Sequence, residues 1–398
     1  MIDETSARLA GSVDPLENGS KIRSLKDLIE HVSGKRLSEA QSQPDSGLLE
    51  VLPFPFLAMV GQVEMKYALL LALINPAIGG VLLIGPRGTG KTTAIRGLVD
   101  LVPEVPRSLC YYGCLPEDIE TGGIDAVCPD CAKKYAMGEP MAVMDKIRLV
   151  ELPLNARIED VIGAPDENAL DYERYRLHRG ILGHADRNLL LVDEVNLLSD
   201  EVVDAILDAA AYGSYTVKRG TMSAAFRSRF VLIGTMNPEE GRLRPQILDR
   251  FGLRIVVRGL EDTHERLEAY QRVKTYLANP RQVILEYKDE TNVAQSEVQT
   301  ARDILPEVKV PEEVSRHGLE LIRQLKIDSL RAEITLFEGA RALAALDNRK
   351  TVGTEDLYTI APMALRMRRS DFIEKFLSDQ GTEENEIINA VKQAVKTS

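Results

Sequence analysis

The sequence is short of cysteine and of positive charge, and it has no long apolar run. Its 398 residues include 4 cysteines, and 49 Lys and Arg residues stand against 61 Asp and Glu residues, for a net charge of −12. Such a chain lacks the positive field that general binding to nucleic acids or anionic membranes requires. No apolar run approaches the roughly 20 residues that span a bilayer. The composition disfavours a nucleic-acid motor, and we expect no nucleic-acid partner and no membrane span.

The N-terminus is polar and lacks the charged-then-apolar pattern of a secretory signal. We therefore expect a cytoplasmic protein, in which cysteines are reduced or bound to metal rather than paired in disulfides. The chain exceeds the usual size of one domain. We expect a mobile extension over 1–50, a core domain over 51–260, a helical linker over 261–305 and a C-terminal helical lid over 306–398.

One stretch predicts a nucleotide site. The apolar run Val81 to Ile84 is typical of a buried strand, the pattern Gly-x-x-x-x-Gly-Lys-Thr follows, and a helix is expected over Thr93 to Val102. Strand, loop and helix in this order are the setting of a P-loop. Its backbone N–H groups are expected to surround the phosphates of ATP along Gly85, Pro86, Arg87, Gly88, Thr89, Gly90, Lys91, Thr92 and Thr93. Lys91 would reach the β- and γ-phosphates, and the Thr92 hydroxyl would bind Mg²⁺.

A second motif ends another apolar strand. Leu189 to Val192 leads directly into Asp193 and Glu194. Asp193 is expected to hold the Mg²⁺ ion that Thr92 also approaches. Glu194 is expected to polarise the attacking water. Unpaired buried carboxylates are costly, which disfavours a purely structural pair.

Three further residues are candidates for phosphate contacts. The strand Phe230 to Met236 ends in Asn237, within reach of the γ-phosphate or of the water that attacks it. Arg250 follows a short helix, before a strand over Ile255 to Val257, and is either a finger for a neighbouring site or a surface ion-pair partner. Arg331 lies in the first turn of its helix, where a cation opposes the dipole, which favours a phosphate contact over a structural role.

The segment before the P-loop is a candidate for the wall of the adenine site. Val60, Gly61 and Gln62 precede a helix expected over Val63 to Ile74. A loop and helix in this position often cover the base, although an ordinary helix entry fits the spacing equally well.

The four cysteines fall within one insertion, over 108–135. They have the spacing Cys110-x₃-Cys114-x₁₃-Cys128-x₂-Cys131. Two close pairs with a spacer are typical of a tetrahedral Zn²⁺ site, while free or redox-active thiols are the alternative. Glycines and prolines interrupt the segment, so we expect a metal to hold an otherwise structureless insertion.

The rest of the chain gives coarser expectations. A strand is expected over Ile147 to Leu154, then a charged insertion over 157–183 whose Leu177 to Gly180 piece either lines a ring pore or is a solvated loop. A hairpin turns at Arg219-Gly220, and lid helices are expected over Pro311–Leu325, Ser329–Leu346 and Thr354–Arg366. We expect Pro362 to kink or restart the last helix. The basic run Arg366 to Arg369 is expected to be a solvated face.

In sequence, these motifs resemble those of an AAA+ ATPase and, more narrowly, of the I subunits of magnesium chelatase. The resemblance covers residues 54 to about 375, and it rests on the following blocks: Val60-Gly-Gln-x-x-Met-Lys66, Gly85-x-Arg-Gly-Thr-Gly-Lys-Thr92, Val192-Asp-Glu-Val-Asn-Leu-Leu198, Asn237-Pro-Glu-Glu-Gly-x-Leu-Arg-Pro-Gln-x-Leu-Asp-Arg-Phe-Gly252 and Leu330-Arg-x-Glu-x-Thr335.

The resemblance implies an α/β fold, a P-loop NTPase with a five-stranded parallel sheet and a C-terminal helical lid. It implies a hexameric ring with ATP at the interfaces, in which Asn237 is sensor 1, Arg250 the arginine finger and Arg331 sensor 2. It further implies that the ring works with a D subunit carrying a von Willebrand factor A domain and with a porphyrin-binding H subunit, to insert Mg²⁺ into protoporphyrin IX. Two alternatives are a MoxR-like remodelling ATPase and a chelatase ATPase for another metal.

Overall fold

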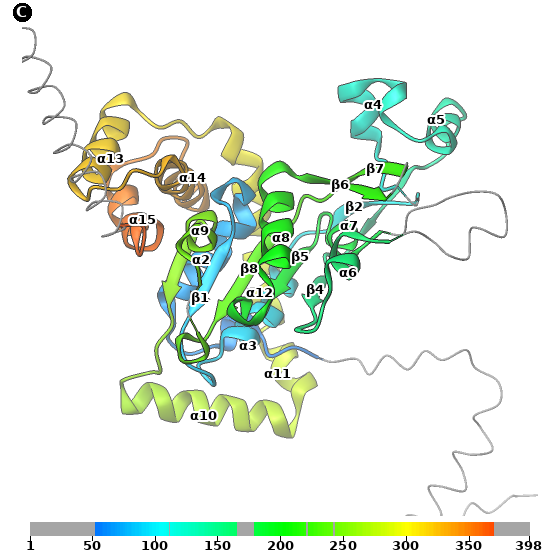
Figure 1. Ribbon diagram of the computed structural model, residues 1–398. Helices are drawn as coiled ribbons and strands as arrows, with labels where there is room; N and C mark the ends of the chain where they lie inside the picture. Colours follow the sequence, from blue (N-terminus) through cyan, green and yellow to red (C-terminus); the bar gives the residue numbers. More distant parts are fainter. Residues whose placement is uncertain (1–51, 111, 165–178, 220–221, 242, 370–398) are drawn as a thin grey trace, which may run out of the picture. The chain divides into compact units, whose positions relative to one another are not determined.

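The computed structural model describes residues 52–110, 112–164, 179–219, 222–241 and 243–369 (Figure 1). These residues belong to one compact unit that begins at Leu52. The expected extension over 1–50, the centre of the insertion including Leu177 and His178, and the chain from 370 onward lie outside the described residues. No described helix is long and apolar enough to cross a bilayer. The cytoplasmic location stays a prediction.

A five-stranded sheet forms the centre of the unit (Figure 1). Its strand order is β4-β5-β8-β1-β9, and every neighbouring pair is parallel. This confirms the predicted fold class. The strands are β1 (Val81–Ile84), β4 (Leu149–Leu152), β5 (Leu189–Val192), β8 (Val231–Met236) and β9 (Leu253–Val256). β4 is shorter than expected, and β9 begins two residues earlier.

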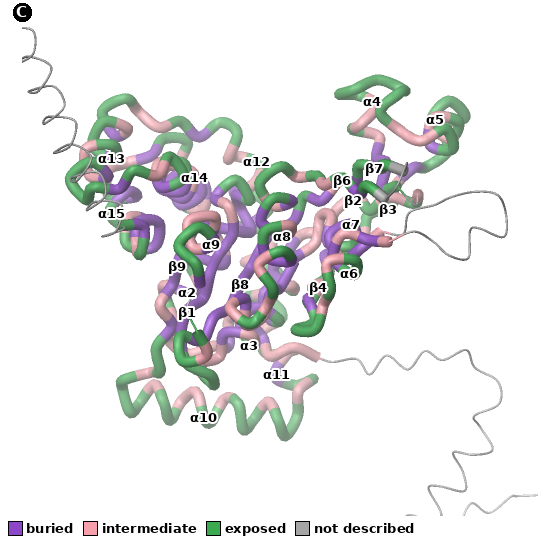
Figure 2. Tube along the Cα trace, in the orientation of Figure 1, coloured by how far each residue is buried: buried purple, intermediate pink, exposed green. Residues whose placement is uncertain are grey.

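Apart from β4, the sheet is buried on both faces, as parallel sheets generally are. Figure 2 shows β1, β8 and most of β9 buried. Alternate side chains enter two separate cores, so that Val81 and Leu83 face one core while Leu82 and Ile84 face the other. This is why the strands are continuous apolar runs rather than alternating ones.

Helices cover each face of the sheet. The first core contains side chains of α2 (Val63–Ile74), α3 (Lys91–Leu98), α12 (Lys288–Ile304), α13 (Glu312–Gln324), α14 (Leu330–Leu346) and α15 (Thr354–Leu365). The second contains those of α6 (Ile158–Ile162), α7 (Ile181–His184), α8 (Asp200–Tyr212) and α9 (Pro245–Arg250). α2 has the predicted bounds, ending where Asn75 and Pro76 follow.

The expected linker over 261–305 consists of three helices, since α10 (Thr263–Ala278) and α11 (Pro280–Glu286) precede α12. Asp262 caps α10 and Asn279 caps α11, each by accepting a hydrogen bond from a backbone N–H. α10 buries none of its residues, whereas α12 contributes Val298 and Ala301 to the first core. The predicted linker is therefore partly a structural member of the domain.

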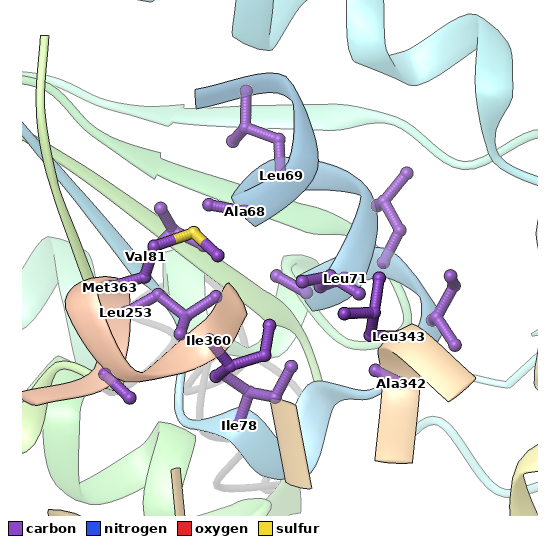
Figure 3. Packing of buried hydrophobic residues seen from close by; sticks show 14 of the residues in the cluster. Ala68, Leu69, Leu71, Ile78, Val81, Leu253, Ala342, Leu343, Ile360 and Met363 are labelled. Carbon is purple, nitrogen blue, oxygen red and sulfur yellow. The ribbon is translucent and has the colours of Figure 1, made fainter. Parts of the chain in front are cut away.

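The lid helices α13, α14 and α15 lie within a residue or so of their predicted bounds. Figure 3 shows Ile360 and Met363 of α15 packed with Val81 of β1 and Leu253 of β9. Pro362 lies inside α15, which continues to Leu365, so the predicted restart is wrong. Burial of the residues on either side of Pro362 offsets the backbone hydrogen bond that a proline cannot make.

The lid packs on α2 and on the starting end of β1, rather than over the phosphate loop. Thr335 of α14 donates a hydrogen bond to the carbonyl of Ile78, which precedes β1. Arg368 is fully buried at the same end, and donates to the carboxylate of Asp249 at 2.8 Å and to the carbonyl of Gly252 at 3.0 Å. The prediction of a solvated face over Arg366 to Arg369 is therefore wrong for Arg368, because this guanidinium joins the lid to β9.

We predict that Gly252→Ala destabilises the domain far more than Gly259→Ala. A Cβ atom at Gly252 would lie 1.9 Å from the carbonyl oxygen of Ile78, whereas one at Gly259 meets nothing within 4 Å. Forcing two backbone segments apart should lower the free energy of unfolding by about 1–3 kcal/mol. Urea denaturation of both variants measures this, and equal losses would contradict the close approach.

Candidate functional site

The P-loop follows β1 and leads directly into α3. Gly88 and Gly90 have φ angles of 78° and 84°, which side chains rarely tolerate. Lys91 is the first residue of α3, two positions earlier than the predicted helix start. The sequence glycines therefore serve the turn that brings backbone N–H groups around a central concavity.

The head of Lys91 turns into this loop. Its Nζ donates hydrogen bonds of 2.7 Å to the carbonyls of Gly85 and Pro86, and the side chain is almost fully buried. Burial lowers the pKa of Lys91, while the neighbouring carboxylates of Asp193 and Glu194 act in the opposite direction. The loop thus holds the Lys91 ammonium beside the cavity that would receive an anionic group.

Asp193 and Glu194 emerge where β5 ends, beside the end of β8. The Thr235 hydroxyl of β8 donates a hydrogen bond to Oδ1 of Asp193 and accepts one of 2.9 Å from the backbone N–H of Glu194. Glu194 has a left-handed backbone with φ 51°. Thr235 was missed by the sequence reasoning, although a lone hydroxyl in an apolar strand is a usable signal. This residue fixes the two carboxylates relative to the neighbouring strand.

These segments surround one cavity of about 210 Å³. Its lining combines the P-loop and both strand ends, and consists of Arg87, Gly88, Thr89, Gly90, Lys91, Thr92, Thr93, Asp193, Glu194, Thr235 and Asn237. The structure therefore brings together the predicted Mg²⁺ and water-activating residues with the P-loop from Arg87 to Thr93, whereas Gly85 and Pro86 do not line the cavity. Hydroxyl and carboxylate oxygens are the ligands that Mg²⁺ prefers, and amide N–H groups suit phosphate, so the residues present fit ATP with Mg²⁺.

A second cavity of about 570 Å³ adjoins the first and shares Gly88, Thr89, Gly90 and Thr93 with it. Val60 and Gln62 line it as predicted, while Gly61 does not. Its remaining wall is largely apolar and includes Phe54 and Met59 with Val273, Tyr276 and Leu277 of α10. An apolar space beside a phosphate cavity suits an adenine base. The contribution of α10 was not predicted, because its distance along the chain gives no sequence signal.

Arg250 and Arg331 lie away from this cavity and line neither part of it. Arg250 ends α9, just before β9 begins, whereas the P-loop follows the end of β1. Because β1 and β9 are parallel, Arg250 and the P-loop lie at opposite edges of the sheet. Arg331 lies at the same edge as Arg250, with its Nη1 3.6 Å from Oδ2 of Asp249. Neither arginine therefore faces the P-loop of its own chain.

The cysteine insertion has regular structure, so the prediction of an otherwise structureless segment is wrong. Strands β2 (Val105–Ser108) and β3 (Ala142–Asp145) pair as an antiparallel ribbon, and helices α4 (Pro116–Gly122) and α5 (Pro129–Ala136) lie between them. Pro116 and Pro129 occupy first helical positions, where proline is favoured, rather than breaking structure.

The four sulfur atoms converge. The Sγ atoms of Cys110, Cys114, Cys128 and Cys131 all lie within 4.8 Å of one another. Cys110 Sγ accepts hydrogen bonds from the backbone N–H groups of Tyr112 and Cys114, and Cys114 Sγ accepts one from Cys128. Hydrogen bonds from Cys114 lower the pKa of Cys110 to about 4, while burial raises the pKa of Cys131 to about 12. The donor set and spacing fit a tetrahedral Zn²⁺ ion.

The insertion is joined to the rest of the domain by ion pairs. β6 (Ser214–Arg219) and β7 (Met222–Arg227) form the predicted antiparallel hairpin. Arg227 of this hairpin pairs with Asp118 of α4, and Arg187 pairs with Glu117 at 2.7 Å. The cysteine insertion and the hairpin therefore contact each other directly.

Comparisons with known proteins identify relatives of the chain. Residues 319–391 match the family described as "AAA lid domain". A "magnesium-chelatase subunit ChlI homolog" from Methanocaldococcus jannaschii is 41% identical over 343 residues, which are 85% of this chain and 92% of the relative. A "magnesium-chelatase 38 kDa subunit" from Acidiphilium rubrum is 40% identical, over 82% of this chain and 94% of the relative.

A crystal structure from Cytophaga hutchinsonii shares the fold, with a TM-score of 0.50 and 21% identity over 78% of this chain and 83% of that chain. The parallel sheet, the lid match and the identity over most of the chain all agree on one assignment. The chain belongs to the family of magnesium-chelatase I subunits and their homologues, which are AAA+ ATPases.

Proposed function

We propose that this chain is the ATP-hydrolysing motor subunit of a magnesium chelatase, and that it drives insertion of Mg²⁺ into protoporphyrin IX together with D and H subunits. The observation that carries the proposal is the single cavity shared by Lys91, Asp193 and Asn237. The names of its relatives, which describe subunits of magnesium chelatase, support the choice of reaction.

Within the cavity, each residue has a distinct role in the proposal. Lys91 binds the phosphates, and Thr92 and Asp193 hold Mg²⁺, which supplies charge neutralisation to ATP when bound. Glu194 takes the proton of the attacking water, and the amide of Asn237 orients that water or the terminal phosphate. In the adjoining apolar cavity, Val60 and Gln62 contact the base, while Gly61 admits the side chain of Leu260, which would lie 2.6 Å from a Cβ atom there.

The arginines support assembly into a ring, which we propose to be a hexamer. Arg250 and Arg331 share the edge of the sheet opposite to the P-loop. In a head-to-tail arrangement, both arginines of one chain would therefore face the nucleotide bound by the adjacent chain. In the single chain, Arg250 pairs with Asp208 at 2.8 Å and with Asp204 at 3.2 Å, both on α8. Both aspartates are exposed and Arg250 is partly exposed, so these ion pairs are weak enough to be replaced by a contact with phosphate.

We predict that two inactive variants restore activity when mixed. The Lys91→Ala chain cannot bind phosphate at its own P-loop but still supplies Arg250 to the neighbouring site. The Arg250→Ala chain has a complete P-loop but supplies no arginine finger to its neighbour. At a 1:1 ratio, random assembly pairs a complete P-loop with an intact finger at about a quarter of interfaces. Phosphate release should therefore exceed that of either variant alone. Arg244→Ala, which removes an exposed arginine just before α9, should keep wild-type turnover. Mixtures no more active than their components would contradict the shared site.

Reconstitution tests the proposed reaction. With D and H subunits, ATP, Mg²⁺ and protoporphyrin IX, the wild-type chain should produce the fluorescence of Mg-porphyrin. Glu194→Gln should bind ATP with an affinity within about threefold of the wild-type value but lose about 10²-fold or more in turnover, because the water activator is gone. ATP turnover without porphyrin metallation would instead favour a MoxR-like remodelling ATPase with a von Willebrand factor A domain partner, or a chelatase for another metal.

We further propose that Cys110, Cys114, Cys128 and Cys131 bind one structural Zn²⁺ ion. Zn–S bonds of about 2.3 Å in a tetrahedron place the sulfurs about 3.8 Å apart, which agrees with sulfurs that lie within 4.8 Å. The backbone N–H groups that point at these sulfurs suit thiolates bound to a metal. Free thiols are the alternative.

We predict about one zinc per chain in protein purified without added metal, measured by elemental analysis. Cys128→Ser should lower the zinc content and lower the melting temperature, because the insertion loses its central cross-link. Thr121→Ala, which removes an exposed hydroxyl hydrogen-bonded to the Glu117 carbonyl within α4, should keep the metal. Protein that carries no stoichiometric metal would rule out this site.

A further inference from the structure

The side chain of Arg87 joins the three segments that line the phosphate cavity. Its Nη2 lies 2.9 Å from Oε1 of Glu194, and the same nitrogen pairs with Glu240. Arg87 belongs to the P-loop, Glu194 follows β5, and Glu240 ends η7 (Pro238–Glu240) directly after Asn237 and β8. One guanidinium therefore bridges the P-loop wall of the cavity and the wall made by the two strand ends.

The backbone of Glu194 is already fixed by other contacts. Its N–H donates to Thr235, and its φ of 51° is a conformation that non-glycine residues adopt at a cost. The direction of the carboxylate is therefore set by the side-chain torsions and by what the carboxylate contacts. Among the described residues, its hydrogen-bond partner is Arg87.

Glu194 and Glu240 place two negative charges at one guanidinium. Their side chains are 18% and 21% exposed, so water screens their mutual repulsion only in part. The hydrogen bond with Glu194, followed by the charges of Glu194 and Glu240, raises the pKa of Arg87. The ammonium of Lys91 is turned into the carbonyls of the loop. Arg87 is thus the cation that contacts both carboxylates directly.

We infer that Arg87 is a positioning residue, which orients the Glu194 carboxylate toward the cavity and offsets its repulsion by Glu240. This inference rests on the proposed function, because it takes Glu194 as the group that activates water. Arg87 acts on Glu194, and the phosphates are gripped by the loop backbone and Lys91. The side chain of Arg87 is 69% exposed, and exposed ion pairs contribute little to stability. Its loss should therefore alter turnover rather than folding or nucleotide affinity.

The first test compares Arg87→Met with the wild-type chain. Turnover should fall roughly tenfold to a hundredfold, because a misplaced catalytic group loses that much. The dissociation constant of a fluorescent ATP analogue should stay within about threefold, and the melting temperature within about 2 °C. Arg87→Lys should recover part of the turnover, since a point charge satisfies both carboxylates less well than a planar guanidinium.

Glu240→Gln supplies a readout specific to the proposed contact. Added to Arg87→Met, it should restore part of the lost turnover, because it removes the charge that repels Glu194. The losses of turnover in the two single variants and the double variant should be non-additive, because both residues act on the same Glu194 carboxylate. Arg96→Met is the matched control, since Arg96 is an exposed arginine of α3 that pairs with Glu151 outside the cavity. It should leave turnover unchanged.

Wild-type turnover in Arg87→Met would overturn the inference, and so would a joint loss of affinity, melting temperature and turnover. Additive behaviour of Arg87→Met and Glu240→Gln would overturn it as well. These results leave the proposed function intact if Glu194→Gln is inactive. Wild-type turnover in Glu194→Gln would instead refute the role of Glu194, and the inference about Arg87 would fail with it.

Discussion

The candidate site depends on the parallel alignment of β1, β5 and β8. Because these strands run in the same direction, the P-loop, the pair Asp193 and Glu194, and Asn237 all emerge at one edge of the sheet. Burial of the strands on both faces fixes their register, since a slip of one residue would exchange the two apolar cores. The Thr235 hydroxyl adds a polar link between neighbouring strand ends at this edge. The residues of the site are therefore positioned by the packing of the sheet against the two apolar cores.

The opposite edge of the sheet is organised by buried charge. Arg254 and Arg368 are both fully buried, and Asp249 is the carboxylate that faces them. Burial lowers the pKa of Arg254 to about 9, and the charge of Arg368 acts in the same direction. Removing Asp249 would leave two buried guanidiniums without this carboxylate, which is strongly destabilising. Asp249 also accepts from Ser329 at the start of α14, so the lid is held at the end of the helix that carries Arg250.

Much of this arrangement could be predicted from sequence, because the P-loop and the strand ending in Asp193 and Glu194 are local patterns. The elements that were wrong or missed depend on neighbours distant in the chain. Pro116 and Pro129 looked like breakers, but each begins a helix, which local sequence leaves ambiguous. Arg368 looked exposed because its run is basic, yet its contacts with Asp249 and Phe251 join residues more than a hundred positions apart. That Arg331 lies at the same edge of the sheet as Arg250 follows from the packing of α14 beside Asp249 and not from any sequence motif.

The same geometry accounts for why one chain alone would be an incomplete machine under the proposed function. The cavity edge gathers the carboxylates of Asp193 and Glu194, with Glu240 beside it, while Arg250 and Arg331 lie at the other edge. A head-to-tail contact would present Arg250 and Arg331 to the neighbour's phosphate cavity, and such contacts close into rings when the rotation between copies allows it. Arg250 already has carboxylate partners on α8, so joining a neighbour exchanges one ion pair for another. The net gain in association free energy is then small unless a nucleotide supplies further negative charge. The strength of the contact between copies would therefore depend on whether the cavity contains a nucleotide.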